Sequence, residues 1–120
     1  MKLICLILIL ASVAISQDAP FACNLKVFQP EERKQHAKLT HEVMAAIANH
    51  RELPSGYAFQ IDSNRVSLLE LAEWVQQEKR CCPFFDFQIA LEGAGEGGLT
   101  LTLTGKDGVK QFITAEFHKP

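Results

Sequence analysis

The segment "FDFQIALEGAGEGGLTLTLTG", residues 85–105, decides the fold because it has the pattern of two strands joined by a turn. Leucine alternates with threonine through residues 99–104, and the first half alternates in the same way. Successive side chains of a strand point to opposite faces of a sheet, so each half has one apolar face. The glycines of residues 94–98 favour a turn. The sequence therefore predicts an antiparallel hairpin whose first strand buries Phe85, Phe87, Ile89 and Leu91.

A helix and a further strand are predicted upstream of this hairpin. Residues 29–50 repeat apolar side chains at every fourth position, which is typical of a helix, and Pro30 suits its first turn. The sequence "ELPSG", residues 52–56, ends this helix. Residues 57–62, "YAFQID", then alternate as a half-buried strand does.

Two more helices complete the predicted elements. Ser67 and Glu70 have the spacing of a capping box, which marks a helix start. Pro83 ends that helix, since a proline disfavours the helical conformation for the residue before it. A short last helix is predicted from Asp107 to Phe117.

The expected fold is α+β, with the element order α-β-α-β-β-α. A right-handed crossover gives a three-stranded antiparallel sheet of order 1-3-2, with the helices packed on one face. This is a ferredoxin-like sheet that lacks one strand. Residues 22–28, "ACNLKVF", also alternate, so the segment before the first helix fits an additional edge strand.

The N-terminus has the features of a secretory signal peptide. Lys2 precedes thirteen apolar or small residues, which are too few to span a hydrocarbon core about 30 Å thick. Cleavage is predicted after Ser16. We therefore expect an exported protein, periplasmic or secreted, with a signal peptide at 1–16, an N-terminal segment at 17–29 and a single domain at 30–120.

Length and charge narrow the possible partners. A chain of 120 residues is long enough for one modest domain. The net charge is −2 and no stripe of basic residues is present, so nucleic acid is not expected as a partner. After cleavage of the signal peptide, no membrane association is expected.

The cysteines are the unusual chemical feature of this chain. Cys5 leaves with the signal peptide, so Cys23, Cys81 and Cys82 remain. In an oxidising compartment an odd number means that one thiol stays free, pairs with another chain or binds a ligand.

A soft-metal site is the leading hypothesis for these residues. Glu78 precedes Cys81 by three residues and Cys82 by four, so the three side chains share one helix face. Thiolates select soft ions of the zinc, copper or mercury type, and the negative end of a helix favours a cation. The predicted metal ligands are Cys81, Cys82, Cys23 and Glu78, in a protein without catalytic activity.

Two alternatives remain open. Cys23 fits a disulfide with Cys81 or Cys82, which would make a thiol–disulfide redox protein, and the cysteines also fit a structural or interaction domain without metal. A catalytic cysteine is disfavoured because the helix end and Glu78 are both negative. The four histidines, His36, His41, His50 and His118, are interpreted as structural or solvated.

The segments "ELPSGYAFQI", "LLELAEWVQQEKRCCPFFDFQIAL" and "LTLTGKDGVKQFI" resemble a group of small, largely uncharacterised bacterial proteins. Their shared core is similar to E-x-x-C-C-P-F, followed by a hairpin and a TG-x-x-G-V-K turn. Related segments are loosely associated with metal-responsive transcription regulators. The resemblance covers residues 22–117 and implies that Glu78, Cys81, Cys82 and Cys23 are the functional positions, without implying an activity.

Overall fold

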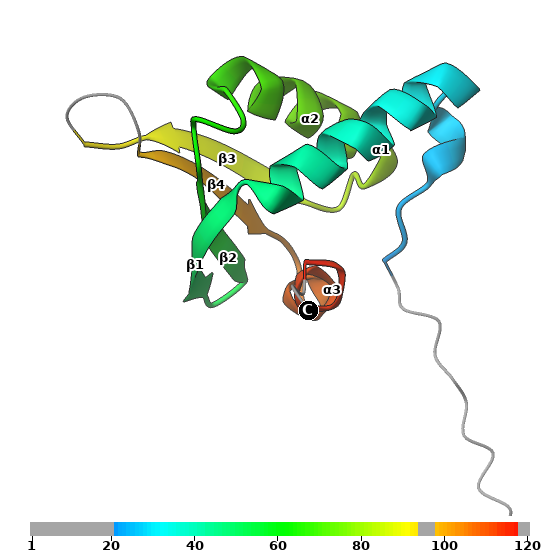
Figure 1. Cartoon of the computed structure of the whole chain (residues 1–120). Coiled ribbons are helices and arrows are strands. Elements are labelled where there is room, and N and C mark those ends of the chain that lie inside the picture. Colours follow the sequence, from blue (N-terminus) through cyan, green and yellow to red (C-terminus); the bar gives the residue numbers. More distant parts are fainter. Residues whose placement is uncertain (1–20, 94–97, 118–120) are drawn as a thin grey trace, which may run out of the picture.

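The computed structural model describes residues 21–93 and 98–117, and Figure 1 shows their arrangement. The predicted signal peptide, Cys5, His118 and most of the glycine-rich turn lie outside these residues. The described elements in chain order are η1 (Leu25–Val27), α1 (Pro30–Ala45), β1 (Ile47–Leu53), β2 (Gly56–Ile61), α2 (Leu68–Cys81), β3 (Asp86–Leu91), β4 (Leu99–Thr104) and α3 (Val109–Glu116).

The four strands form one antiparallel sheet in the order β1-β2-β4-β3. β4 therefore lies between β2 and β3, and β1 forms an edge beside β2. The register of the central pair places Phe59 opposite Leu101 and Ile61 opposite Leu99. These side chains are buried on one face, which α1 and α2 cover (Figure 1).

The α+β class is confirmed, but the predicted three-stranded sheet of order 1-3-2 and the element order α-β-α-β-β-α are wrong. The observed order is α-β-β-α-β-β-α, because residues 47–53 form β1 instead of continuing the first helix. α1 ends at Ala45. Ile47 has the four-residue spacing of Leu39 and Val43 in the sequence, but it is the first residue of β1.

The sequence gives no sign of β1 because this strand lacks an apolar face. Its two ends, Ile47 and Leu53, are half-buried, and the five residues between them are exposed. Its pairing with β2 depends on main-chain hydrogen bonds, which any residue except proline can make. An edge strand that is exposed on both faces shows little alternation of hydrophobicity.

The predicted boundaries of α2 are confirmed. The Ser67 hydroxyl accepts a hydrogen bond from the Glu70 amide, and the Glu70 carboxylate accepts one from the Ser67 amide. At the other end Cys82 has φ −125° and ψ 67°, outside the helical region, as expected of a residue before proline. The last turn of α2 therefore presents two adjacent cysteines at a fixed point of the fold.

The N-terminal segment does not form the additional edge strand that its alternation suggested. Asn24 caps the short 3-10 helix η1 with its side chain. The main-chain amide of Asn24 donates to the Cys81 carbonyl over 2.8 Å. An asparagine side chain competes readily for nearby amides, which favours such a turn over a strand. The segment is thereby fixed against the end of α2.

The core lies between the sheet and the three helices. Trp74 and Leu71 of α2 are fully buried above the sheet. Phe117, at the end of α3, stacks on Phe59 with 5.4 Å between ring centroids and meets Trp74 edge-on at 6.5 Å. These contacts pack the end of α3 against β2 and α2.

Candidate functional site

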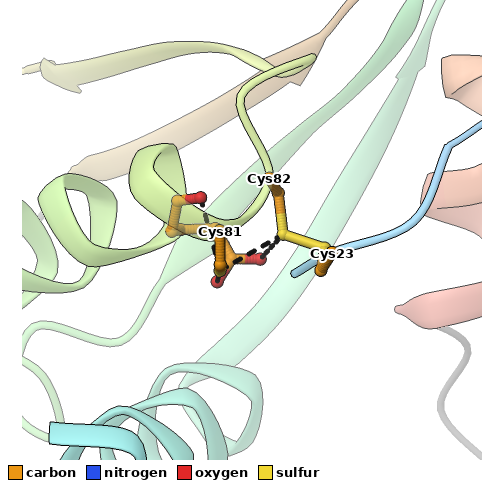
Figure 2. Close-up of side chains that lie close together, drawn as sticks. Cys23, Cys81 and Cys82 are labelled. Carbon is orange, nitrogen blue, oxygen red and sulfur yellow. Dashed lines mark hydrogen bonds between the residues drawn. A yellow bond between two sulfur atoms is a disulfide. The ribbon is translucent and has the colours of Figure 1, made fainter. Parts of the chain in front are cut away.

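The candidate site lies at the C-terminal end of α2, where the N-terminal segment meets it (Figure 2). Cys23 forms a disulfide with Cys82 across a sequence separation of 59 residues. The sequence allowed a disulfide between Cys23 and either Cys81 or Cys82, and the structure has the bond to Cys82. Cys82 is fully buried and Cys23 is half-buried, so Cys23 is the more exposed residue of the bond.

Cys81 adds a third sulfur to the disulfide. It carries no disulfide itself, is buried, and has its Sγ 3.4 Å from that of Cys82. The neighbours share a direction because Cys81 ends the helix while Cys82 has left the helical conformation. Three sulfurs therefore converge at one point.

Glu78 brings a carboxylate to these sulfurs. Its Oε1 lies 3.3 Å from Cys82 Sγ and its Oε2 lies 3.8 Å from Cys81 Sγ, as the helical spacing predicted. One ligand atom from each of Cys23, Glu78, Cys81 and Cys82 can be chosen such that all four lie within 4.8 Å of one another. The predicted ligand set thus forms a group that could hold a metal ion.

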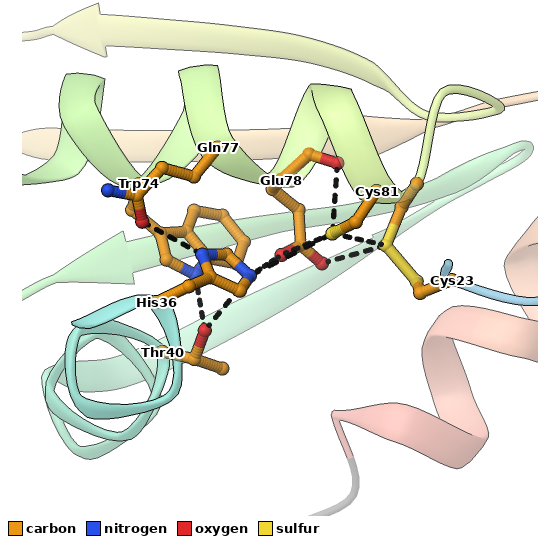
Figure 3. A network of polar contacts seen from close by, with 8 residues as sticks. Cys23, His36, Thr40, Trp74, Gln77, Glu78 and Cys81 are labelled. Atoms are coloured by element: carbon orange, nitrogen blue, oxygen red, sulfur yellow. Dashed lines mark hydrogen bonds and ion pairs between the residues drawn. A yellow bond between two sulfur atoms is a disulfide. The ribbon is translucent and has the colours of Figure 1, made fainter. Parts of the chain in front are cut away.

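His36 belongs to the same site, and its interpretation as a structural or solvated histidine missed this. Its side chain from α1 is buried, and its Nε2 lies 2.9 Å from Glu78 Oε2 and 3.8 Å from Cys81 Sγ (Figure 3). A sequence signal existed: His36 precedes Leu39 by three residues and Val43 by seven, which places it on the buried stripe of the helix.

The hydrogen bonds of His36 favour its charged form. Nδ1 lies 2.8 Å from Gln77 Oε1 and Nε2 faces Glu78, so both ring nitrogens meet an acceptor oxygen. An imidazole can donate from both nitrogens only when it is protonated. Burial by itself would lower the pKa of His36, but the contacts with Cys81, Glu78 and Gln77 raise that pKa to about 10.

A second layer of hydrogen bonds holds this histidine in place. Trp74 Nε1 donates to Thr40 Oγ1 over 3.0 Å, and that hydroxyl lies 3.4 Å from His36 Nε2 (Figure 3). In the described part of the chain, no buried side-chain nitrogen or oxygen lacks a hydrogen-bond partner. The polar network is complete, so it can order the sulfur cluster without an unsatisfied group.

Basic residues near the end of α2 support the backbone around the site. Lys79 Nζ donates to the carbonyls of Pro83 and Phe85, at 3.1 and 2.8 Å, and so fixes the chain that leaves the helix. Arg80 donates to the Glu32 carboxylate over 3.0 Å and to the Val27 carbonyl over 3.1 Å. Both cations thus bind backbone or carboxylate oxygens, and His36 is in contact with Cys81 Sγ.

The other residues singled out from the sequence lie apart from the site. His41 is exposed on α1, and His50 is exposed in β1 instead of ending a helix. Among the residues that the structure describes, no helix is long and apolar enough to cross a membrane.

Comparison with known proteins adds no family: no family model, no curated protein and no solved structure matches this chain. The fold and the site define an α+β protein with a buried cluster of three sulfurs, one carboxylate and one imidazole.

Proposed function

We propose that the reduced form of this protein binds one soft metal or metalloid ion, without catalysis, through Cys81, Cys82, Cys23 and Glu78. The observation that carries the proposal is the convergence of these four ligand groups within 4.8 Å, from two segments far apart in the sequence. The N-terminal sequence supports a role for the protein outside the cytoplasm.

The sulfur spacing suits a shared ion. Two thiolates that each lie about 2.3 Å from one tetrahedral ion are separated by about 3.8 Å. Cys81 Sγ and Cys82 Sγ are separated by 3.4 Å, so a small rotation of either side chain reaches that value. The disulfide withholds two of the three sulfurs, and therefore reduction must come before binding.

The surroundings of the cluster favour thiolates that bind an ion. A metal ion deprotonates the thiols that coordinate it, so binding releases protons. The imidazole of His36 beside Cys81 offsets part of the negative charge that three thiolates and Glu78 bring together. A buried cluster also removes competing water, which strengthens each bond to the ion.

The test is a titration of reduced protein under argon with Zn(II), Cu(I) and Hg(II), followed by native mass spectrometry. A Cys5→Ser background keeps three thiols whether or not the N-terminus is cleaved. We expect one ion per chain and loss of three alkylatable thiols on binding. Failure of all three ions to bind a protein shown to have three free thiols would refute the proposal.

The carboxylate gives a matched pair of variants. Glu78→Gln should weaken binding at least about tenfold, because it replaces a negatively charged carboxylate, as ligand or as acceptor beside the sulfurs, by a neutral amide. Glu73→Gln is the control, because it makes the same change at an exposed position of α2. Equal affinity in the two variants would remove Glu78 from the site.

A second candidate function, thiol–disulfide exchange, is favoured by the Cys23–Cys82 bond itself. An external thiolate would attack the sulfur of Cys23, the more exposed residue, forming a mixed disulfide there and releasing Cys82 as the leaving thiolate. Equilibration with redox buffers distinguishes the roles: exchange proteins have potentials between about −270 and −120 mV, and structural disulfides lie below about −300 mV.

A further inference from the structure

An open hollow of about 930 Å³ adjoins the sulfur cluster. Its walls come from the N-terminal segment, α1 and α3, and Cys81 and Cys82 line its buried part. Figure 2 shows Cys23 on the N-terminal chain, bonded to Cys82 with Cys81 beside it. Ordinary small-molecule sites span about 300–1,000 Å³, and a water molecule takes about 30 Å³. The hollow is therefore of the size of an organic ligand, much larger than one ion.

The lining of the hollow is mostly apolar. Leu25 from the N-terminal segment, Ala37 from α1, and Phe112 and Ala115 from α3 contribute to three of its sides.

The cationic groups among its walls already have partners. His36 pairs with Glu78, and the guanidinium of Arg33 donates to the carbonyls of Leu25 and Phe28. An apolar group therefore fits this space better than an anion does.

We propose that the ligand of this site is a trivalent organic metalloid, of the class of monosubstituted arsenicals R–As(OH)₂ with an apolar R group. Cys81 and Cys82 hold the arsenic, and the R group lies in the hollow between α1 and α3. The inference rests on the proposed function, because it assigns a ligand class to the same sulfurs.

The chemistry balances without a change in the oxidation state of arsenic. A phosphine first opens the Cys23–Cys82 disulfide: it gives two electrons to the sulfurs and becomes its oxide with the oxygen of one water, whose two protons make the thiols. Condensation then breaks two S–H and two As–OH bonds, forms two As–S bonds, and releases two waters. The As–R bond is untouched.

The test compares phenylarsine oxide, which hydrates to the phenyl member of this class, with arsenite. The Cys5→Ser protein is reduced with a phosphine, freed of it, and titrated with each compound against a competing small dithiol. The peptide EKRCCPFF, residues 78–85, gives the reference ratio of the two affinities for adjacent thiols without a hollow. We expect the ratio of the affinity for phenylarsine oxide to the affinity for arsenite to be at least about tenfold higher for the protein than for the peptide, because the protein buries the ring.

Variants that fill the hollow locate the ring. Ala37→Trp and Ala115→Trp place an indole at exposed rim positions on different helices, where the fold should tolerate it. Each should lower phenylarsine oxide affinity about tenfold and leave arsenite affinity unchanged. Ala45→Trp is the control, since this exposed residue of α1 is not among those that line the hollow.

The outcomes separate this inference from the proposed function. If the protein binds arsenite but prefers phenylarsine oxide no more strongly than the peptide does, the inference is overturned and the metal or metalloid site still stands. An unchanged phenyl preference in both filled variants would also overturn it. If neither arsenical binds and Zn(II), Cu(I) and Hg(II) fail as well, both proposals fall.

Discussion

His36 and Glu78 form a buried ion pair between two helices, with 2.9 Å between Nε2 and Oε2 across 42 positions of sequence. The exposed fractions of the two residues are 4% and 8%. The pair joins the N-terminal half of α1 to the last turns of α2 and borders the three sulfurs. The charge of the site, its stability and its affinity for a ligand are therefore coupled.

Stability should fall as the pH rises from about 6.5 to about 10. The pKa of His36 is raised to about 10 in the folded state from an ordinary value near 6.5, so the folded state holds a proton that the unfolded state has lost. The stabilisation is fully present below pH 6.5 and disappears as the pH passes through the folded pKa. Urea unfolding at intervals from pH 6 to 10.5 measures this slope.

Two histidine variants isolate the source of that slope. His36→Gln should flatten the dependence in this range, and His41→Gln, at an exposed position of the same helix, should leave it as in the unmodified protein. A slope that persists in His36→Gln would show that another group titrates.

Breaking the buried pair on one side should cost more than removing both partners. Glu78→Leu leaves the imidazolium of His36 without its counter-charge and should lower the free energy of unfolding by about 3–5 kcal/mol at pH 7. The double variant His36→Leu/Glu78→Leu should recover part of that loss, as measured by urea unfolding. Additive losses would mean that the two side chains do not interact.

A surface ion pair provides the comparison. Glu31 and Lys34 lie 3.5 Å apart with both side chains exposed. Glu31→Leu should change the free energy of unfolding by no more than about 1 kcal/mol, because solvent screens exposed pairs.

Loss of the disulfide should destabilise the oxidised protein. The Cys23–Cys82 bond closes a loop with a sequence separation of 59, and the chain-entropy relation gives about 4 kcal/mol for a loop of that length. Cys23→Ser should lower the free energy of unfolding by about this amount without a reductant and by much less with one. Equal stability of Cys23→Ser and the unmodified protein in oxidising buffer would contradict the disulfide.

The sheet should not tolerate a side chain at Gly56, the first residue of β2. A Cβ built there lies 1.9 Å from the carbonyl oxygen of Leu103 in the neighbouring strand. Gly56→Ala should cost about 2–4 kcal/mol, because the backbones of β2 and β4 must separate. Ser55→Ala, at the exposed neighbouring turn position, should cost less than about 0.5 kcal/mol by the same unfolding assay.

Local sequence was sufficient to predict where α2 begins and ends and which side chains share its last turn. The cap at Ser67 and Glu70, the stop before Pro83 and the shared face of Glu78, Cys81 and Cys82 all depend on residues within about one turn of each other. The strands with one apolar face were predictable for the same reason, since the period of two is written along each strand. The alternation was wrong for Leu91, which was expected to be buried and is exposed at the end of β3, because the cover of the sheet does not extend to that end of the strand.

Only the tertiary structure shows that residues 47–53 form a strand, that His36 lies beside Glu78, and that Cys82 pairs with Cys23. β1 pairs through its backbone and has no apolar pattern to read, so the three-stranded prediction failed at that edge. His36 reaches Glu78 across 42 positions of sequence and Cys23 reaches Cys82 across 59, through helix packing and the hydrogen bond from the Asn24 main-chain amide to the Cys81 carbonyl. Side-chain period fixes which face of an element is buried, whereas the packing of distant elements fixes what that face meets.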